Sequence, residues 1–353
     1  MNKQRFSVLF ATLIIVTIVV SGCGSPGGTA TVKELSGAGA TFPYPLYSKM
    51  FDSYNAATGV RVNYNSIGSG GGIKALTDKT VDFGASDAFL NEQELAAMGA
   101  PVLHIPTCVG AVVLSYNLDG NPALKLDDTV TANIFLGKVT KWNDPSITAL
   151  NPGLSLPDLT ITVVHRSDGS GTTSIFTSYL AAVSPSWKSA VGAGKSVSWP
   201  TGVGGKGNDG VAGMISQTKG GIGYVELVYA EQSRMPFASL KNASGTFVTP
   251  SLASSAAAAA VSLPDDLRVV IVNSPGADAY PISAFTWILV YKEQNYTGRT
   301  LEQAQALKKL VTWMLTDGQA INEGLSYAKL PAAAVTKAMA LLDSMTYDGA
   351  VIP

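Results

Sequence analysis

The stretch LTITVVHRSDGSGTTSIFTSYLAAV, residues 159–183, decides the class of fold. Its first part is rich in β-branched residues and predicts a strand that ends at Arg166. Its last part, residues 172–183, repeats apolar side chains at helical spacing and predicts a helix. A strand that passes through a short glycine-rich turn directly into a helix is typical of α/β proteins with largely parallel sheets.

The turn between them, RSDGSGTT (166–173), has the chemistry of an anion site. The first N–H groups of a helix lack intrahelical partners and carry partial positive charge, and glycine lets a ligand approach the backbone closely. Arg166 adds a planar, permanently charged fork that suits two oxygens of an anion. Asp168 is well placed to hold that guanidinium, and it also suits a turn or a helix N-cap.

Two more turns repeat this chemistry. GAGATFP (37–43) leads into a helix expected at 46–55, and IGSGGG (67–72) leads into one expected at 73–78. Any one of these turns suits an ordinary loop, since glycine and serine are common loop residues. Together, three such turns provide enough N–H and hydroxyl donors to surround a tetrahedral anion without a lysine.

Asp87 ends the segment VDFGASD (81–87), at the carboxyl end of another expected strand. A carboxylate in an anion site repels its ligand unless the ligand carries a proton to donate. Protonated phosphate carries one near neutral pH, because its relevant pKa is about 6–7, whereas sulfate does not. Asp87 is therefore expected to select phosphate against sulfate, at a cost to sulfate on the order of 2–5 kcal/mol.

Strands and helices alternate along the rest of the chain. We expect strands at residues 60–66, 81–86, 111–117, 159–166, 221–229, 267–273 and 285–292. We expect further helices at residues 172–183, 301–325 and 332–345.

Composition narrows the function. The chain has 353 residues, 46% of them apolar, with 24 Lys and Arg against 25 Asp and Glu, so it suits two or three folded units and offers no charge run for nucleic acid. Two His and two Cys exclude a Cys/His zinc site and a disulfide framework, so we expect no metal and no cofactor. One of the two, Cys108, lies in an apolar run and is interpreted as a buried small hydrophobe.

The N-terminus predicts export. Two basic residues precede the apolar run at 6–20, which is too short to span a bilayer comfortably and is typical of a signal peptide. The following VSGC resembles a lipobox, so residues 1–22 are expected to be removed and Cys23 lipidated, with 23–30 as a flexible tether. The alternative is an uncleaved anchor with an incidental cysteine.

The ordered motifs resemble those of a known family. The motifs on which this resemblance depends are GAGATFP (37–43), IGSGGG (67–72), VDFGASD (81–87), RSDGSGT (166–172), WPTGVGGKGNDG (199–210) and GGIGYVE (220–226). Together they resemble the periplasmic phosphate-binding protein of the bacterial ABC-type phosphate importer, the PstS family. The resemblance runs from about Ser36 to the C-terminal helices, so it covers nearly the whole chain after the tether.

This resemblance implies an α/β, two-lobed type II periplasmic-binding-protein fold, with two mixed or parallel sheets flanked by helices and a ligand cleft between the lobes. Residues 31–112 with 285–353 would form lobe I, and residues 113–284 lobe II. It also implies delivery of phosphate to an ABC permease by a monomeric receptor. The expected location is outside the cytoplasm, facing the periplasm or the cell exterior, with the membrane reached only through the lipid anchor.

The same resemblance implies a set of phosphate-binding residues and no catalytic ones. They are Thr41, Phe42, Ser69, Asp87, Arg166, Ser170, Gly171 and Thr172, with Asp168 fixing Arg166. Two departures from the family pattern are Gly70, where many relatives carry serine, and His165, where a second basic residue is common. We interpret His165 as a bystander, since neighbouring side chains on a strand point to opposite faces.

Other readings are weaker. A secreted hydrolase lacks support, because neither Ser69 nor Ser170 lies in a G-x-S-x-G elbow. The string G-x-G-x-x-G at 202–207 matches the dinucleotide-binding fingerprint, but it follows Trp-Pro instead of a clear strand. We therefore interpret it as a turn near the cleft, leading into a helix that starts at Asn208 and Asp209. A receptor for sulfate, molybdate or tungstate conflicts with Asp87, and a surface lipoprotein for adhesion or signalling remains a third class.

Overall fold

One eight-stranded sheet organises the computed structural model, which describes residues 32–353. The strand order is β2-β1-β3-β11-β4-β8-β6-β7. These strands are β1 (Glu34–Gly39), β2 (Arg61–Ser66), β3 (Phe83–Ser86), β4 (Val102–Tyr116), β6 (Thr162–Arg166), β7 (Val203–Gly205), β8 (Gly221–Glu226) and β11 (Ser283–Tyr291). Parallel pairs join β1 to β2 and β3, and β6 to β7 and β8, while β4 and β11 pair antiparallel with their neighbours.

Strand β4 connects the two parallel groups. Its first residues pair with β11, and its last residues, Val112 to Tyr116, pair with β8. Every residue of β4 after Val102 is buried, as expected of a strand covered on both faces. The two sheets that we expected are therefore joined through β4 into one continuous eight-stranded sheet. Cys108 lies buried in this strand, which confirms its interpretation as a small core residue.

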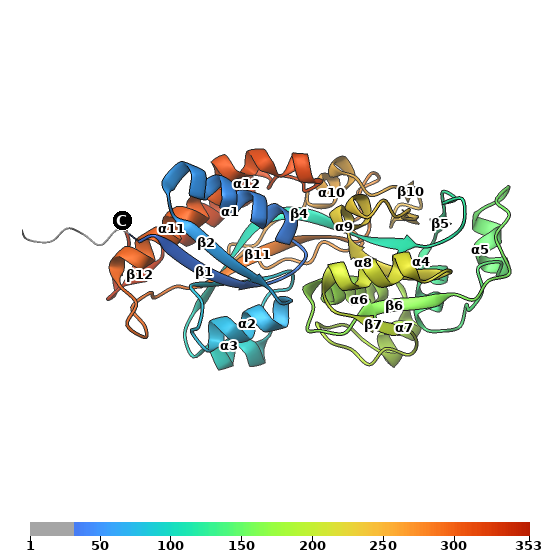
Figure 1. The fold of residues 1–353 in the computed structure, drawn as a ribbon, viewed down its shortest axis with the longest axis horizontal. Helices are drawn as coiled ribbons and strands as arrows, with labels where there is room; N and C mark the ends of the chain where they lie inside the picture. Colours follow the sequence, from blue (N-terminus) through green and yellow to red (C-terminus); the bar gives the residue numbers. More distant parts are fainter. Residues whose placement is uncertain (1–31) are drawn as a thin grey trace, which may run out of the picture. The chain divides into compact units, whose positions relative to one another are not determined.

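Helices cover both parallel groups (Figure 1). They are α1 (Tyr44–Thr58), α2 (Ser69–Thr77), α3 (Glu92–Met98), α4 (Asp128–Phe135), α5 (Pro145–Leu150), α6 (Gly171–Val183), α7 (Pro185–Ala190), α8 (Gly207–Gln217), α9 (Leu227–Gln232), α10 (Leu252–Ala258), α11 (Leu301–Leu315) and α12 (Ala332–Asp343). Figure 1 shows α1 to α3 beside β1 and β2, and α6 to α8 beside β6 and β7. The minor strands are β5 (Lys125–Leu126), β9 (Ser239–Lys241), β10 (Phe247–Val248), β12 (Thr346–Tyr347) and β13 (Ala350–Val351).

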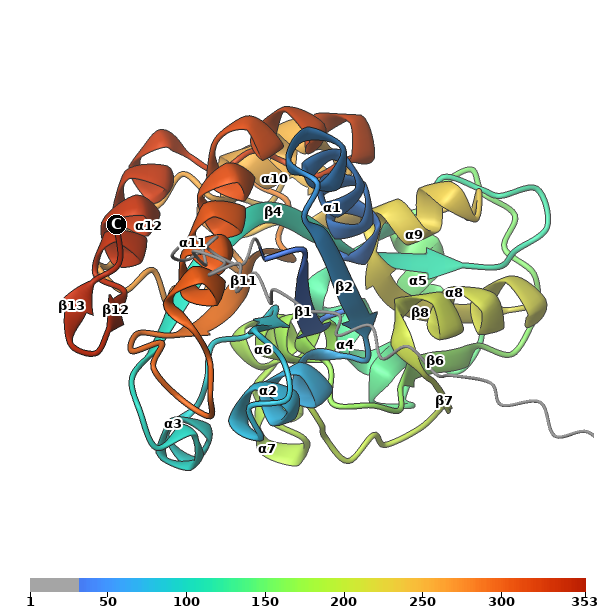
Figure 2. The same cartoon turned by 60° about the vertical axis from the view of Figure 1, so that its left-hand side comes forward.

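The apolar stripes read from the sequence are the buried faces of their helices. Helix α1 buries Leu46, Met50 and Tyr54, which lie one turn apart. Helix α6 buries Ile175 and Tyr179 in the same way. Helices α11 and α12 pack together with the β12–β13 hairpin near the C-terminus, as Figure 2 shows.

One predicted strand is wrong, and another is shorter than predicted. Residues 267–273 form no strand, because Leu267 and Asn273 both have positive φ, which ends extended backbone at each end of the stretch. The strand predicted at 221–229 stops at Glu226, whose side chain accepts a hydrogen bond from the Val228 amide and caps α9.

Two predicted helices have different limits. The helix predicted at 301–325 ends at Leu315 and continues as 3-10 turns, Asp317–Ile321 and Glu323–Leu325. The helix predicted at 73–78 begins earlier, at Ser69, so the glycine run lies inside its first turn. A Cβ on Gly72 would lie 2.5 Å from the carbonyl oxygen of Ala38, so glycine lets α2 pack directly on β1.

Some expectations are not tested by this fold. The signal peptide at 1–22, the lipidated Cys23 and the tether at 23–30 lie outside the described residues. Residues 32–353 form one compact unit, and their division into two lobes stays a prediction. Within this unit no helix is both long and apolar enough to cross a membrane.

Candidate anion-binding site

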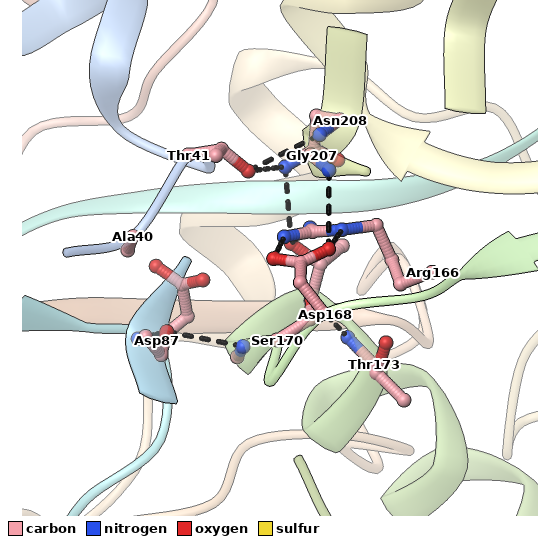
Figure 3. Close-up of polar contacts among 12 residues, drawn as sticks. Ala40, Thr41, Asp87, Arg166, Asp168, Ser170, Thr173, Gly207 and Asn208 are labelled. Atoms are coloured by element: carbon pink, nitrogen blue, oxygen red, sulfur yellow. Dashed lines mark hydrogen bonds and ion pairs between the residues drawn. The ribbon is translucent and has the colours of Figure 1, made fainter. Parts of the chain in front are cut away.

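The residues predicted to bind phosphate converge at the carboxyl ends of the parallel strands (Figure 3). Thr41 and Phe42 follow β1, Asp87 follows β3, and Arg166 ends β6. Ser69 begins α2, and Ser170, Gly171 and Thr172 lie at the start of α6. All of these residues are buried. The three glycine-rich turns are therefore neighbours in space, as the strand-to-helix pattern predicts.

Arg166 is held in place by Asp168. The guanidinium donates from Nε to Oδ1 at 2.8 Å and from Nη2 to Oδ2 at 2.5 Å, while Nη1 lies 3.4 Å from the Thr172 hydroxyl. Burial alone would raise the pKa of Asp168, but the hydrogen bond and charge of Arg166 outweigh it, so this pKa lies below its usual value. A two-point contact of this kind fixes the plane of the arginine fork.

Ser69 connects the turn before α6 to the end of β3. Its Oγ accepts hydrogen bonds from the Gly171 amide at 3.0 Å and from the Asp87 amide at 3.3 Å. Beside it, the Gly70 amide donates to the carbonyl oxygen of Gly169 at 2.8 Å. A Cβ on Gly171 would lie 2.5 Å from both Ser69 Oγ and Asp87 Oδ2, so only glycine permits this close approach.

Asn208 belongs to the same group, although it is not among the residues predicted to bind phosphate. Its Nδ2 donates to the hydroxyl oxygens of Thr41 at 2.8 Å and Thr172 at 3.1 Å, and its Oδ1 accepts from the Glu226 amide at 3.0 Å. The preceding Gly207 has positive φ and donates its amide to Asp168. The turn expected at 202–207 leads into α8, as predicted, and its end contacts Asp168 and Thr41. The glycine-rich run before a helix is the signal in the sequence that could have pointed to Asn208.

Two tyrosine hydroxyls orient the backbone of the first turn. Tyr229 donates to the carbonyl oxygen of Thr41 at 2.5 Å, and Tyr327 donates to that of Phe42 at 2.6 Å. In a trans peptide the carbonyl and the next N–H point in opposite directions, so Tyr229 also fixes the Phe42 amide. Tyr327 gives the carbonyl oxygen of the buried Phe42 a hydrogen-bond donor, so this side of the turn is held as well.

Asp87 is a buried carboxyl group in this polar cluster. Its Oδ1 accepts a hydrogen bond from the Thr286 hydroxyl at 2.7 Å, and Thr286 comes from β11, the strand paired with β3. Burial raises the pKa of Asp87 to about 7, although Thr286, the charge of Arg166 and Ser69 each lower it in part. Near neutral pH the group can therefore exchange a proton with a ligand.

This pKa predicts a pH-dependent stability of the phosphate-free protein. Folding raises the pKa of Asp87 from 3.8 to about 7, so the folded state binds the extra proton and stability falls as pH rises through this range. The loss is on the order of 2–4 kcal/mol, and Asp87→Asn removes it. Urea unfolding of both proteins at pH 4.5 and 8 measures the difference. Equal losses of stability in the two proteins would contradict the prediction.

A cavity of about 610 Å³ borders the cluster where Gly70, Asp87 and Gly169 meet. Its wall includes the ion pair between Lys195 and Glu94, 2.7 Å apart, which joins α3 to the loop after α7. This pair, like the Gly70–Gly169 contact, connects the two parallel groups of the sheet across the site.

Other polar residues lie aside from the cluster. The ring of His165 stacks on Trp199 with centroids 4.8 Å apart, and its Nδ1 contacts the Arg166 carbonyl. The His165 side chain therefore packs against Trp199, and among the residues that the structure describes it makes no hydrogen bond to the side chains of the cluster. Across residues 32–353, no three His, Cys, Asp or Glu side chains come close enough to hold a metal ion.

This arrangement defines a class of protein. Parallel strands that lead into helix N-termini around a buried arginine are typical of sites that bind small anions. Consistent with this, the family model described as "PBP superfamily domain" matches residues 24–318. The fold is that of a type II periplasmic binding protein, as two solved structures also show.

The first of these structures is a high affinity periplasmic phosphate-binding protein bound with phosphate at pH 8.5. It has a TM-score of 0.71 and 22% identity, and the match covers 87% of this chain and 93% of that one. The second, from Clostridium perfringens, is described as a candidate phosphate ABC transporter substrate-binding protein with bound phosphate. Its TM-score is 0.60 at 19% identity, with 84% of this chain and 100% of that one covered. At these identities the two structures show the fold alone.

The particular family follows from sequence similarity. The "Phosphate-binding protein PstS" of Xylella fastidiosa strain Temecula1 is 48% identical over 308 residues, covering 86% of this chain and 83% of that protein. The chain belongs to the PstS family of phosphate-binding proteins. It is thus a binding protein and not an enzyme.

Proposed function

We propose that the chain receives inorganic phosphate at the cluster around Arg166 and Asp87 and delivers it to an ABC-type phosphate import permease. The observation that carries this proposal is the pairing of a buried, oriented arginine fork with a buried carboxyl group beside three helix N-termini. A cation and an acceptor in one site suit an anion that still carries a proton.

Each predicted residue then has a role. The Arg166 fork binds phosphate oxygens while Asp168 keeps it in plane, and Asp87 accepts the phosphate proton. The remaining donors are the amides and hydroxyls of Thr41, Phe42, Ser69, Ser170, Gly171 and Thr172. The Gly171 amide donates to Ser69 Oγ, so binding phosphate through it requires this contact to be exchanged for a phosphate oxygen.

Closure around the ligand follows from how the cluster is built. Ser69 and Thr41 belong to the segments around β1 to β3, and Gly171 and Asn208 belong to those around β6 and β7. Phosphate would bridge these two groups, with β4 and β11 as the segments about which they move. The bridged form is then the one that a permease recognises.

Names of relatives support delivery to a permease. Among the similar structures is one described as a candidate phosphate ABC transporter substrate-binding protein. An exported receptor suits this role, and lipidation of Cys23 would keep a monomeric receptor at the cell membrane, facing the periplasm or the exterior.

Isothermal titration of protein freed of phosphate tests the proposal. One phosphate is expected to bind per chain, and equimolar sulfate is expected to change the measured affinity by less than about twofold, because sulfate has no proton for Asp87. Absence of phosphate binding would contradict the proposed ligand. Equal binding of the two anions would contradict the role of Asp87 while leaving the anion site in place.

A further inference from the structure

Glu226 is a second buried carboxyl group close to the site. Its side chain caps α9, and none of the phosphate-binding roles above uses it. It ends β8 and is fully buried. A Cβ on Gly110 of β4 would lie 2.6 Å from the Phe42 ring and 3.4 Å from Glu226 Oε1. The side chains of Phe42 and Glu226 therefore pack against the same glycine, next to the first phosphate-binding turn.

The hydroxyl of Tyr327 lies between Glu226 and this turn. Its oxygen is 2.6 Å from the carbonyl oxygen of Phe42 and 3.0 Å from Glu226 Oε2. A phenol has one proton to donate, and a backbone carbonyl can only accept. When Tyr327 donates to Phe42 at the shorter distance, its contact with Glu226 is a hydrogen bond only if Glu226 supplies the proton.

The remaining contacts of Glu226 favour the same assignment. Oε2 accepts from the Val228 amide at 2.9 Å, and Oε1 has no hydrogen-bond partner among residues 32–353. In an ionised carboxylate this buried oxygen would share a negative charge with no donor, whereas with the proton on Oε2 it is a neutral carbonyl oxygen, which costs less to bury. Burial, the largest effect, raises the pKa of Glu226 well above its ordinary value.

The titratable groups that interact with Glu226 within residues 32–353 are Tyr229 and Glu231 on α9, Cys108 on β4, Asp87 after β3, and Tyr327 before α12, and none of these is a cation. Arg166 acts on Tyr229, whereas the charges that act on Glu226 are those of Glu231 and Asp87. Glu231 and Asp87 raise the pKa of Glu226 further. With Asp87 already beside the ligand, a second buried carboxylate would also repel phosphate.

We propose that Glu226 is a positioning residue that stays protonated and donates a hydrogen bond to Tyr327, so that Tyr327 donates its own proton to the Phe42 carbonyl. The chain of donors runs from Glu226 through Tyr327 to the turn at Phe42. It keeps the Phe42 carbonyl engaged and away from the anion. This role rests on the proposed function, because it acts on the turn that binds phosphate.

The variant Glu226→Gln tests the protonated state. A glutamine with its amide nitrogen at the position of Oε2 donates to Tyr327 as a neutral glutamic acid does, and it gives up only the bond from the Val228 amide, which caps α9 and does not touch the turn. Glu226→Gln is therefore expected to keep phosphate affinity within about twofold in calorimetry. Glu226→Ala and Tyr327→Phe, which break the chain of donors, are expected to lose about 5- to 10-fold. A loss in Glu226→Gln as large as in Tyr327→Phe would overturn the proposal.

Infrared difference spectroscopy reads the proton directly and needs no ligand. The spectrum of the full-length wild-type protein at pH 8.5, minus that of Glu226→Gln, is expected to show the C=O band of a protonated carboxylic acid. The frequency of this band is expected to shift when Tyr327→Phe removes the hydrogen-bond acceptor of that acid. Glu231→Gln, the same change on an exposed residue of α9, is expected to show no such band. A wild-type spectrum without the band would overturn the proposal even if Glu226→Ala fails to fold. Failure of phosphate to bind would refute the proposed ligand and leave the band as the test of Glu226.

Discussion

Replacing Arg166 by alanine is expected to weaken phosphate binding by about 30-fold to several thousand-fold. Removing one member of a buried, hydrogen-bonded charge pair costs on the order of 2–5 kcal/mol. Here the loss has two parts. The anion loses its fork of N–H donors, and Asp168 keeps a partly buried negative charge with no arginine beside it. Isothermal titration at fixed salt and pH 7.5 measures the effect.

Arg299→Ala is the matched control. Arg299 is also buried and pairs with an aspartate, Asp82, but this pair lies before β3, at the strand end opposite Asp87. This variant is expected to lose stability and keep phosphate affinity within about twofold. Arg166→Lys keeps the charge without the planar fork, so an intermediate affinity is expected. Wild-type affinity in Arg166→Ala would remove Arg166 from the site.

The parts of the site that could be predicted are local in sequence. Arg166 and Asp168 are two residues apart at a strand end, so their contact follows from short-range geometry. The turns that precede α1, α2 and α6 follow strands whose apolar pattern is clear, and parallel strands place their carboxyl ends along one edge. Position along the chain therefore sufficed to bring these turns together.

The rest depends on contacts that no local pattern encodes. Thr286 reaches Asp87 only because β11 pairs with β3 across 199 residues of sequence. Tyr327 reaches Phe42 from 285 residues away. The error at 221–229 has a similar origin, since the apolar run continues through Val228 while the Glu226 side chain caps a helix. The spacing of apolar residues along the chain predicts neither a helix cap formed by a buried glutamate nor the pairing of strands that are far apart in sequence.

Asp87→Asn is expected to lower the preference for phosphate over sulfate by at least tenfold. In the wild type, a sulfate oxygen would face a buried carboxylate oxygen with no proton between them, at a cost on the order of 2–5 kcal/mol. An asparagine can turn its amide to donate to sulfate, or its carbonyl to accept the proton of phosphate. Both anions then bind, and competition titrations with the two anions measure the ratio.

The pH dependence separates this effect from a general loosening of the site. The pKa of Asp87 is about 7, so below this pH the wild-type group carries a proton and can itself donate to sulfate. Sulfate affinity, measured by direct titration so that the titration of phosphate does not enter, is therefore expected to rise in the wild type from pH 8 to pH 5.5 and to stay nearly constant in Asp87→Asn. Asp209→Asn, the same substitution on an exposed residue next to Asn208, should retain the wild-type profile. An unchanged anion ratio in Asp87→Asn would show that selectivity arises from the donors around Arg166 and not from the carboxyl group.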